Sequence, residues 1–493
     1  MKKSSSLSIF RWAALILIFI AVVITGVELV IYSRIRASFP PGMVIAGVPV
    51  GGMDQSSAAE RLVQAYGIPV ELRYNNAIIQ IRPSVVGFEL DLEAMLAAAD
   101  LQRITQPFWP AFWDFLWNRL PEPKEVPLRA RISEDRLRAY LKEEIAPRYD
   151  QPPAAPLPVA GSVQFNPGRQ GTVLDVDRAV ILISDALRSS GNRVVNLTFS
   201  RVDPPRPSLQ NLEILLKQIL EINQFDGLAE VYLLDLSTRQ EMHFAYNQGE
   251  TIQPDIAFTA ASTMKIPIMF SVMRRVNEPA PQAVTDRIAL MIERSENDPA
   301  DRLMEQVMDP NLGPLQVTDD LRAIGLENTF LAGYFYPGAP LLQRFQTPGN
   351  SRTDVSTEPD DYNQTTPAEM GQLMDEIYQC AENGGGTLRA VFPDQISQSE
   401  CRQMLDYLQK NRIAVLLQAG VPEGTRMAHK HGWILDFDGV IHNISDAAIV
   451  YSPGGNYVAT IYLYHPVQLV FDPINKMVAD ISSAIYNYFN QVR

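Results

Sequence analysis

The chain has 493 residues, of which 46% are hydrophobic and 20% are charged, and its formal net charge is −14. Because a single hydrophobic core stops growing at roughly 250–300 residues, this length predicts two or three domains. The composition is typical of globular proteins and excludes wholesale disorder. The acidic balance argues against nucleic acid as a partner, since binding to phosphates needs clustered Lys and Arg.

The N-terminal segment predicts a membrane anchor. An apolar run extends from Trp12 to Tyr32, with one acid, Glu28, near its outer end. Spanning a bilayer takes about 20 apolar residues, whereas the apolar part of a signal peptide is usually about 7–15 residues long. No A-x-A-like cleavage site follows, so we expect an uncleaved, single-pass anchor in the cell membrane. A cleaved export signal is the alternative, and both place the later domains outside the cytoplasm.

A repeated spacing follows this segment. The two copies read Pro83-x-x-x-Gly87-x-x-Leu90-Asp91 and Pro167-x-x-x-Gly171-x-x-Leu174-Asp175. Each copy comes after a predicted strand and before a predicted helix, so we interpret them as one strand-turn-helix unit used twice. The glycine would supply a permissive backbone and the aspartate would cap the helix. Chance similarity of a common pattern is the alternative.

Between the two copies lies a strongly aromatic segment. Residues 107–123 read PFWPAFWDFLWNRLPEP and contain three Trp and three Phe. Such a segment either packs into a core or lies at a lipid interface, where amphipathic aromatic side chains settle. We favour packing into the core.

The last part of the chain predicts an α+β domain. After a Pro-rich linker that ends near Ser208, one stretch alternates like a hairpin turning near Ser237-Thr238. A second hairpin, turning at Pro453-Gly454-Gly455, stands near the other end, and helical periodicity fills the sequence between them. This order predicts an antiparallel sheet that is assembled from both ends of the domain and covered by helices.

Between these hairpins, Ser262-Thr263-Met264-Lys265 has the spacing S-x-x-K. If Ser262 begins a helix, Lys265 lies one turn further on the same face, within reach of the serine oxygen. A serine hydroxyl is a weak nucleophile until a base accepts its proton, and burial helps a lysine to lose its own proton. Alone this spacing is weak, because a capping serine followed by an exposed lysine gives the same pattern. Two more motifs follow in order, Ser295-Glu296-Asn297 and Lys430-His431-Gly432.

The order S-x-x-K, S-D-N, K-T-G resembles class A β-lactamases and penicillin-binding proteins, from about Phe225 to His465. The surrounding text STMKIPIMF, SENDPADRLME and TTPAEMGQLMDEIY is similar as well. The resemblance implies a β-lactamase/transpeptidase-like α+β fold and an acyl-enzyme mechanism without a cofactor or metal. Residues 40–205 resemble peptidoglycan-binding modules of membrane-anchored wall enzymes, with a plain spacer as an equal alternative. We therefore divide the chain into an anchor with a cytoplasmic tip (1–36), two such modules (37–205) and a serine hydrolase domain (206–493).

The resemblance also assigns roles. Ser262 would attack the substrate carbonyl, Lys265 would take or relay its proton, and Ser295 would help return a proton to the leaving nitrogen. Asn297 would bind the substrate and also hold Lys265, and Lys430 would attract a carboxylate of the substrate. His431 and Gly432, on the same strand as Lys430, would also contribute to substrate binding. The backbone amides of Ser262 and of a residue near Trp433 would form the oxyanion hole.

The departures from the family pattern bear on the activity. Glu296 replaces an aspartate, which adds only a methylene, whereas His431 replaces the Thr or Ser whose hydroxyl binds the carboxylate of a β-lactam. We expect the imidazole to donate a hydrogen bond instead, with a charge that depends on pH. The loop position of the deacylating glutamate falls near Asn350-Ser351, which lacks one, and Glu358 lies too close to Thr365 to be assigned. These departures predict slow or absent β-lactam turnover.

The sequence thus predicts a wall-associated serine hydrolase or transpeptidase-like enzyme. Its partner would be peptidoglycan, cleaved at a peptide or amide bond, or a related β-lactam-like acyl compound. The alternatives are a β-lactamase and a non-catalytic cell-wall-binding protein. The only cysteines, Cys380 and Cys401, either form a bridge or remain as two buried thiols. His429 and His431 have no third ligand in any motif, so we expect no metal.

Overall fold

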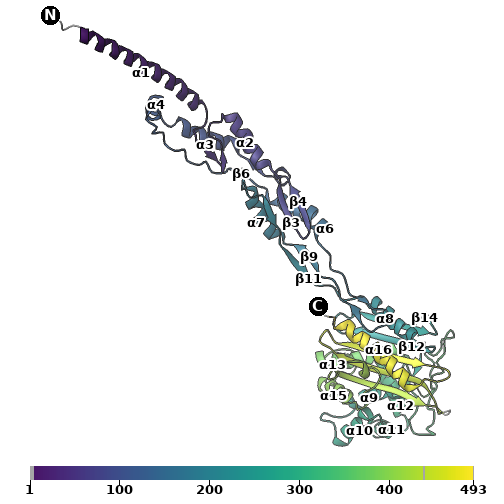
Figure 1. Ribbon diagram of the computed structural model, residues 1–493. Coiled ribbons are helices and arrows are strands. Elements are labelled where there is room, and N and C mark those ends of the chain that lie inside the picture. The colour runs from purple at the N-terminus through teal and green to yellow at the C-terminus, as the bar shows by residue number, and fades with distance from the viewer. Residues whose placement is uncertain (1–4, 437–438, 492–493) are drawn as a thin grey trace. The chain divides into compact units, whose positions relative to one another are not determined.

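The computed structural model describes residues 5–436 and 439–491, and the chain divides into two compact units. The N-terminal unit comprises the chain up to residue 153 together with residues 170–203, and the C-terminal unit comprises residues 154–169 together with the chain from residue 204 onward. Figure 1 shows both units, with α1 at the N-terminal end and a large sheet in the C-terminal unit.

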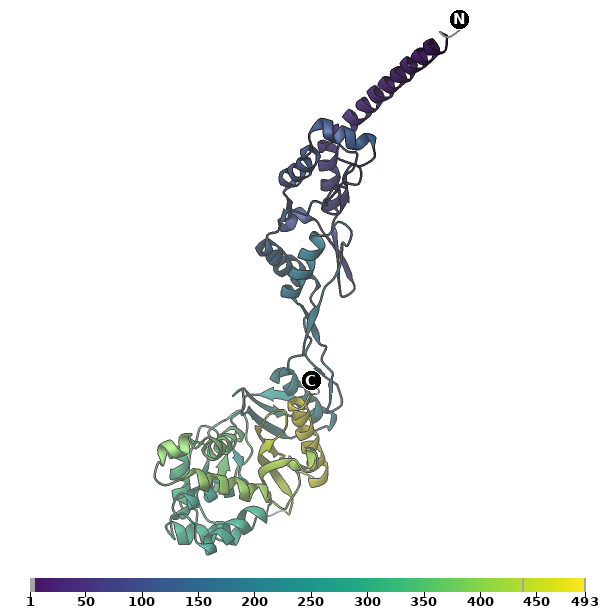
Figure 2. The same cartoon turned by 90° about the vertical axis from the view of Figure 1, so that its left-hand side faces the viewer.

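The N-terminal unit begins with the long helix α1 (Ser5–Ala37). Its stretch Phe10–Ala37 is long and apolar enough to cross a membrane, and it is the one helix of that kind in the part of the chain that the structure describes. A signal sequence near the N-terminus passes the same test. Beside the C-terminal part of α1 lies α4 (Phe108–Leu116), as both Figure 1 and Figure 2 show.

The globular part of the N-terminal unit contains short strands and helices around one core. The remaining elements of this unit are β1 (Val44–Ile45), β2 (Val48–Pro49), α2 (Gln55–Gly67), β3 (Val70–Tyr74), β4 (Ala77–Ile81), β5 (Glu89–Leu90), α3 (Leu92–Ile104), β6 (Ala130–Arg131), α5 (Glu134–Tyr140), α6 (Ala146–Tyr149), β9 (Gly171–Leu174), α7 (Val176–Leu187), β10 (Val194–Asn196) and β11 (Phe199–Val202). Strand β10 pairs in parallel with β3, which pairs with β4 across a turn at Asn75-Asn76. Side chains from the helices that follow the two copies, such as Leu96 of α3 and Ile183 of α7, share this core.

The aspartates of the repeated spacing cap helices as predicted. Asp91 accepts a hydrogen bond from the amide of Ala94 at the start of α3, and Asp175 does the same for the amide of Arg178 in α7, each at 3.0 Å. The two glycines serve different purposes. Gly87 adopts a left-handed conformation with φ of 70°, whereas a Cβ atom at Gly171 would lie 2.6 Å from the carbonyl oxygen of Gln151.

The aromatic segment between the copies does not pack wholly into a core, contrary to the expectation from its composition. Phe112 is buried, but Trp109, Trp113 and Trp117 are 67%, 62% and 60% exposed. Because α4 has one face against α1 and the other face open, the phenylalanines and the tryptophans fall into different environments.

A six-stranded antiparallel sheet forms the centre of the C-terminal unit, in the order β14-β13-β12-β20-β19-β18. Its strands are β12 (Leu228–Asp235), β13 (Glu241–Asn247), β14 (Glu250–Ile252), β18 (Arg426–Leu435), β19 (Ile441–Tyr451) and β20 (Tyr457–Tyr464). Both predicted hairpins are present, and β12 pairs with β20, so the two ends of the domain meet in the middle of the sheet. The predicted α+β architecture is therefore confirmed.

Helices cover both faces of this sheet. On one face α8 (Leu209–Ile222) and α16 (Phe471–Phe489) enclose one core, and on the other face most of the remaining helices enclose a larger one. These remaining helices are α9 (Lys265–Met273), α10 (Gln282–Glu293), α11 (Asn297–Val307), α12 (Gly313–Ala323), α13 (Pro367–Asn383), α14 (Thr387–Val391) and α15 (Gln398–Gln409). Alternate residues of β12 serve the two cores: Val231 and Leu233 face α8, while Tyr232 and Leu234 face the other side.

Three smaller features complete the C-terminal unit. A minor sheet has the order β15-β17-β16, with β15 (Phe258–Thr259), β16 (Phe330–Leu331) and β17 (Asn363–Thr365). The short hairpin of β7 (Leu157–Pro158) and β8 (Phe165–Asn166) brings Phe165 into the core beside α16. Finally, Cys380 of α13 and Cys401 of α15 form a disulfide, with their Cα atoms 5.9 Å apart. The bridge that the sequence left open is thus present.

Candidate active site

Ser262 lies in a short 3-10 helix, Ala261–Met264, that leads directly into α9. The side chain of Thr263 fixes this turn, because its hydroxyl donates to the carbonyl oxygen of Ala260 at 2.6 Å and lies 2.8 Å from the hydroxyl of Tyr462 on β20. Ala261 has a positive φ of 48°, which is uncommon for a residue with a side chain. The turn that presents Ser262 is therefore held in place by the large sheet.

Lys265 begins α9, and its side chain reaches back to Ser262 as the spacing predicts. Its Nζ atom lies 2.7 Å from the Oγ atom of Ser262, 2.7 Å from Oδ1 of Asn297 and 3.0 Å from the carbonyl oxygen of Ser295. The last two partners are acceptors only. A neutral amine has two N–H groups and one lone pair. When those N–H groups bind the two acceptors, the lone pair remains for the hydroxyl proton of Ser262.

The surroundings of Lys265 favour this neutral form. Burial lowers the pKa of Lys265 to about 7, and the negative charge of Asp301 opposes part of this effect. Burial also raises the pKa of Asp301 itself to about 6, although its carboxylate accepts a hydrogen bond from the amide of Phe335 at 2.8 Å. A sizeable fraction of Lys265 is therefore neutral near pH 7, which makes it able to act as a base.

Ser295 lies between α10 and α11 with a positive φ of 61°, and it meets a second buried lysine. Lys430 of β18 donates to the Oγ atom of Ser295 at 2.8 Å and to the carbonyl oxygen of His431 at 3.0 Å. Burial, and secondly the charge of Lys265, hold the pKa of Lys430 well below its ordinary value. Glu296 points away from these groups, since its exposed carboxylate lies 4.0 Å from Arg294, so its extra methylene is tolerated.

Gly432 brings the backbone of β18 close to Ser262. A Cβ atom at this position would lie 3.0 Å from the carbonyl oxygen of Ala260 and 3.1 Å from the amide nitrogen of Ser262. Any larger residue would push the strand away from the serine turn. Trp433, the next residue, lines the same pocket as Ser262. The structure therefore brings the three predicted motifs together around Ser262.

His431 does not join them, in contrast to the expectation that its imidazole would face the substrate. The side chain is only 2% exposed, its Nδ1 atom accepts from Nδ2 of Asn411 at 3.3 Å, and its ring stacks on Trp433 with 4.6 Å between centroids. Burial, and secondly the charge of Lys430, lowers the pKa of His431 to about 2. This pKa is contrary to the expected pH-dependent charge, because it keeps the ring neutral near pH 7.

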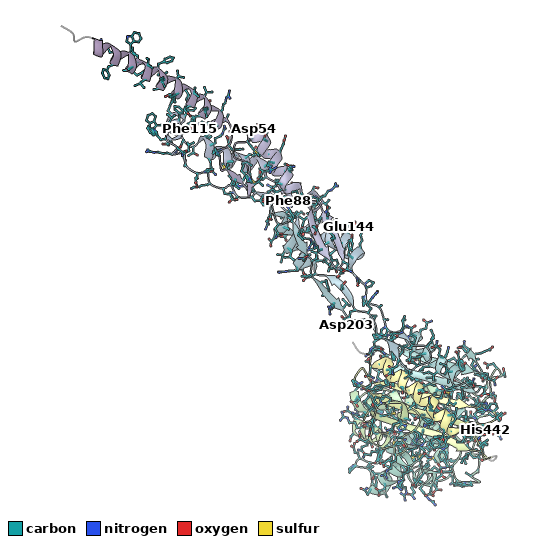
Figure 3. All side chains as sticks on the ribbon, in the orientation of Figure 1. Asp54, Phe88, Phe115, Glu144, Asp203 and His442 are labelled. Carbon is teal, nitrogen blue, oxygen red and sulfur yellow. A yellow bond between two sulfur atoms is a disulfide. The ribbon has the colours of Figure 1, made fainter. Side chains whose placement is uncertain are left out.

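Ser262 and Asn297 open into a pocket of about 890 Å³. Six aromatic side chains line it, namely Tyr334, Phe335, Tyr336, Tyr362, Trp433 and Tyr464. Its lining also contains three carboxylates, Glu358, Asp360 and Asp436, and one histidine, His442, which Figure 3 labels. Among the residues that the structure describes, no lysine or arginine belongs to this lining. The pocket is therefore aromatic and acidic.

The loop before β17 differs from what the family pattern suggests. The side chain of Asn350 is occupied within the loop, where it donates to Oε1 of Gln364 at 2.9 Å and accepts from the amide of Thr347 at 2.8 Å. Glu358 and Asp360 of the same loop line the pocket instead. The carboxylate of Asp360 accepts from the amide of Tyr362 and from Nδ2 of Asn363, both at 2.9 Å, and burial raises its pKa.

Sequence reasoning missed several of these neighbours. Phe335 and Asp360 lie outside every segment compared with the family, whereas Asp301 lies within SENDPADRLME but was given no role there. A further cluster lies outside the pocket lining: Glu230, His243 and Asp255 offer ligand atoms within 4.8 Å of one another. Both oxygens of Glu230 accept protein hydrogen bonds, from the amides of Asp255 and Ile256 at 3.0 Å. We interpret this cluster as a structural brace for the loop before β15.

His429 is likewise occupied away from the pocket. Its Nδ1 atom lies 3.1 Å from the carboxylate of Asp446, and its Nε2 atom lies 2.8 Å from Oε1 of Gln418. The ring is 1% exposed and helps to join β18, β19 and the loop around Gln418. Its spacing to His431 therefore reflects two buried structural roles.

Comparison with known proteins shows the family of the chain. A model of the β-lactamase enzyme family matches residues 211–282 and 280–489, whereas no curated protein matches the chain. Among solved structures, a mutant of PBP-A in an acyl-enzyme complex with penicillin G is 21% identical, with a TM-score of 0.41, covering 57% of this chain and 97% of that one. An ancestral class A β-lactamase of Gram-negative bacteria is 24% identical, with a TM-score of 0.39 and coverage of 56% and 98%.

A β-lactamase from Xanthomonas campestris pv. campestris is 18% identical, with a TM-score of 0.41, and the match covers 57% of this chain and 99% of that one. The residues matched by the family model make up more than half of the chain and include all three motifs around Ser262. The chain therefore belongs to the β-lactamase enzyme family.

Proposed function

We propose that this protein is a membrane-anchored, extracytoplasmic serine hydrolase that transfers an acyl group through Ser262 and acts on a peptide or amide bond of the cell wall. The observation that carries the proposal is the position of Lys265. Its two N–H groups have dedicated acceptors in Asn297 and Ser295, which leaves its lone pair for the hydroxyl of Ser262.

In the proposed reaction, Lys265 accepts the proton of Ser262 while Oγ attacks the substrate carbonyl and forms the tetrahedral intermediate. The amides of Ser262 and Trp433, which flank the close approach at Gly432, stabilise its oxyanion. The hydroxyl of Ser295 donates a proton to the leaving nitrogen as the bond to the acyl carbon breaks. Lys430 holds that hydroxyl in place and replaces its proton. A water then attacks the acyl carbon and gives its proton through Ser295 to Lys430, which has become neutral. Ser262 recovers its proton from Lys265 as the ester bond breaks, which restores both lysines.

The charge of the pocket supports a peptide substrate over an ordinary β-lactam. A β-lactam such as penicillin carries a carboxylate near its reactive bond. Lys430, which was expected to bind such a carboxylate, is buried against Ser295 and is absent from the described pocket lining. Glu358 and Asp360 add negative charge to the pocket instead. A neutral or cationic peptide, lying between the aromatic side chains, fits this lining better.

The proposed location depends on α1. Its apolar stretch is long enough to cross a bilayer, and none of its most apolar window is buried against the rest of the chain. Such a helix is stable only when lipid or another protein covers it. We propose that it anchors the chain in the cell membrane with both units outside. We also propose that the N-terminal unit binds peptidoglycan, because residues 40–205 resemble peptidoglycan-binding modules.

The test is intact mass spectrometry of the full chain in detergent after incubation with a fluorophosphonate, which reacts with activated serines of any acyl-transfer specificity. We expect one adduct on the wild type and on Ser399→Ala, an exposed serine of α15, and none on Ser262→Ala. An unlabelled wild type would favour the non-catalytic cell-wall-binding protein.

The same samples treated with penicillin separate the two enzymatic alternatives. We expect slow labelling of Ser262 and slow release, because the pocket repels the carboxylate and the position expected for the family's deacylating glutamate, near Asn350, holds none. Rapid turnover of penicillin would instead establish a β-lactamase. Cleavage of purified peptidoglycan peptides by the wild type, but not by Ser262→Ala, would identify the substrate class.

A further inference from the structure

The three tryptophans of the aromatic segment lie on one face of one helix. Trp109, Trp113 and Trp117 follow each other at intervals of four residues along α4 and its C-terminal cap, which places them in one row. All three are at least 60% exposed, and the rings of Trp113 and Trp117 contact each other with 6.2 Å between centroids. A soluble protein rarely leaves so many large aromatic side chains in one row open to water.

The opposite face of α4 is fastened to α1. The ring of Tyr32 lies within 5.5 Å of the rings of Phe108, Phe112 and Phe115, and Phe115 is seen beside the end of α1 in Figure 3. Arg36 adds a hydrogen bond to the carbonyl oxygen of Gln106 at 2.8 Å. The tryptophan row is therefore fixed at one level along α1, beside Tyr32.

That level coincides with the expected edge of the bilayer. Trp12 and Tyr32 bound the apolar run and are 20 residues apart. At 1.5 Å per residue, an α-helix rises about 30 Å over this distance, which equals the thickness of a typical hydrocarbon core. If α1 crosses the membrane, as proposed above, α4 lies at the outer boundary between acyl chains and headgroups. Tryptophan is enriched at this boundary because its ring is apolar and its N–H is polar.

Neighbouring side chains suit the same environment. Leu101 and Ile104, at the end of α3 and just before α4, are 64% and 53% exposed. Arg34 of α1 and Arg119 after α4 are exposed cations close in sequence to the aromatic contact. Apolar groups flanked by arginines match a lipid surface, because the cations bind the phosphates while the apolar groups enter the acyl region.

We propose that α4 is an interfacial helix, with Trp109, Trp113 and Trp117 inserted into the outer leaflet beside the anchor. The chain then has two membrane contacts, a crossing helix and a helix that lies in the surface. Together they fix the rotation and tilt of α1, and hence the direction in which the N-terminal unit leaves the membrane, which one crossing helix alone does not do.

The experiment uses the full chain reconstituted in phosphatidylcholine vesicles whose acyl chains are brominated, since bromine quenches nearby tryptophan fluorescence. The chain has five tryptophans, so Trp12→Phe leaves the three of α4 and Trp433. A matched variant with Trp12, Trp109, Trp113 and Trp117 all changed to Phe leaves only Trp433. The difference between the two spectra is the fluorescence of α4.

We expect lipids brominated near the headgroup end of the chain to lower the α4 fluorescence at least about twofold, and more than lipids brominated at the chain terminus. Aqueous acrylamide should quench it little, and Trp433 should not respond to brominated lipid. Quenching of α4 by acrylamide with no effect of bromine would overturn the proposal. Protection from both quenchers would also overturn it, and would indicate that a protein surface covers the row.

Flotation of the vesicles separates this inference from the proposed anchor on which it rests. A chain that floats with the vesicles but shows no bromine quenching retains the anchor and refutes only the interfacial helix. A chain that does not float refutes both. Neither outcome bears on Ser262, because the fluorophosphonate test reads the acyl-transfer function independently.

Discussion

The Nζ atom of Lys430 lies 2.8 Å from the Oγ atom of Ser295, although the two residues are 135 positions apart in the chain. The contact joins β18 to the segment between α10 and α11, so the sheet and the helical layer meet beside Lys265. The contact also places a second buried amine, that of Lys430, near the amine of Lys265. The charge of Lys265 contributes to the lowered pKa of Lys430. Lys265 thus contacts Ser262, and Lys430 contacts Ser295.

This contact predicts coupled losses in acylation. Lys430→Met leaves the hydroxyl of Ser295 without its fixed partner, and Ser295→Ala removes the hydroxyl itself. Each change should slow acylation of Ser262 by about 10²-fold, the usual contribution of a positioned proton donor. The double variant should be no slower than Ser295→Ala alone, because both changes remove one unit. Penicillin labelling rates provide the measurement, because opening of the β-lactam releases a nitrogen that needs this proton. Independent, multiplying losses would contradict the coupling.

The pKa of Lys265 predicts how labelling depends on pH. Because its pKa is about 7, the amine is protonated below that pH and cannot accept the proton of Ser262. The labelling rate should therefore rise about tenfold per pH unit below pH 6 and level off above pH 8. Lys265→Arg keeps the charge at every accessible pH and should label slowly without this rise. A wild-type rate that stays constant from pH 5 to 9 would exclude Lys265 as the base.

His431→Thr restores the residue type of the family motif and tests whether the side chain at position 431 contacts the substrate or is buried away from it. Since the imidazole is buried against Trp433 and Asn411, we expect the change to lower stability by about 1–3 kcal/mol through lost stacking and an unpaired amide. Thermal melting measures this loss. Penicillin labelling should stay within about twofold of the wild type, because the side chain does not line the pocket. A large gain in penicillin reactivity would show that residue 431 does contact the substrate.

The acidic lining predicts a charge preference that can be reversed. Changing Glu358→Gln and Asp360→Asn together removes negative charge from the pocket. Labelling of Ser262 by anionic penicillin should accelerate about three- to tenfold relative to a neutral ester, since one nearby charge contributes on the order of 1 kcal/mol. The gain should shrink at high salt. Glu423→Gln, an exposed acid outside the pocket lining, is the matched control. An equal gain from the control would assign the effect to net charge alone.

The disulfide predicts a loss of stability without loss of the site. Cys380 and Cys401 are 21 positions apart, and cross-links that close loops of this size contribute about 3 kcal/mol. The variant with both cysteines changed to alanine should therefore melt at a lower temperature, yet still label at Ser262. Alkylation of the denatured wild type should add two groups only after reduction, as read by intact mass. Two added groups without reductant would disprove the bridge.

The features that sequence predicted well are those set by nearby residues. The reach of Lys265 to Ser262 follows from helical spacing, and the hairpin turns follow from alternation interrupted by polar or glycine residues. The capping by Asp91 and Asp175 is equally local. In each case residues close together in the sequence determine the geometry, so no knowledge of the tertiary fold was needed.

Other features depend on faces and on irregular loops. Alternation along β18 places Lys430 and Gly432 on one side and His431 on the other, and this rule, applied to the motif, would have corrected the expectation for His431. The position of Asp360 in the pocket lining could not be predicted from alternation, because Asp360 lies in a segment without helix or strand. The exposure of Trp113 depended on which face of α4 meets Tyr32, a contact between segments about 80 positions apart.

The path of the chain between the two units has a consequence for proteolysis. Residues 154–169 belong to the C-terminal unit, residues 170–203 return to the N-terminal unit, and the chain leaves it again at residue 204. A single cut at any one of these crossings leaves at least one unit built from pieces of both fragments, and Phe165 stays packed against Tyr488. A single cut at one of these crossings therefore leaves the two fragments held together by a unit that both of them help to build.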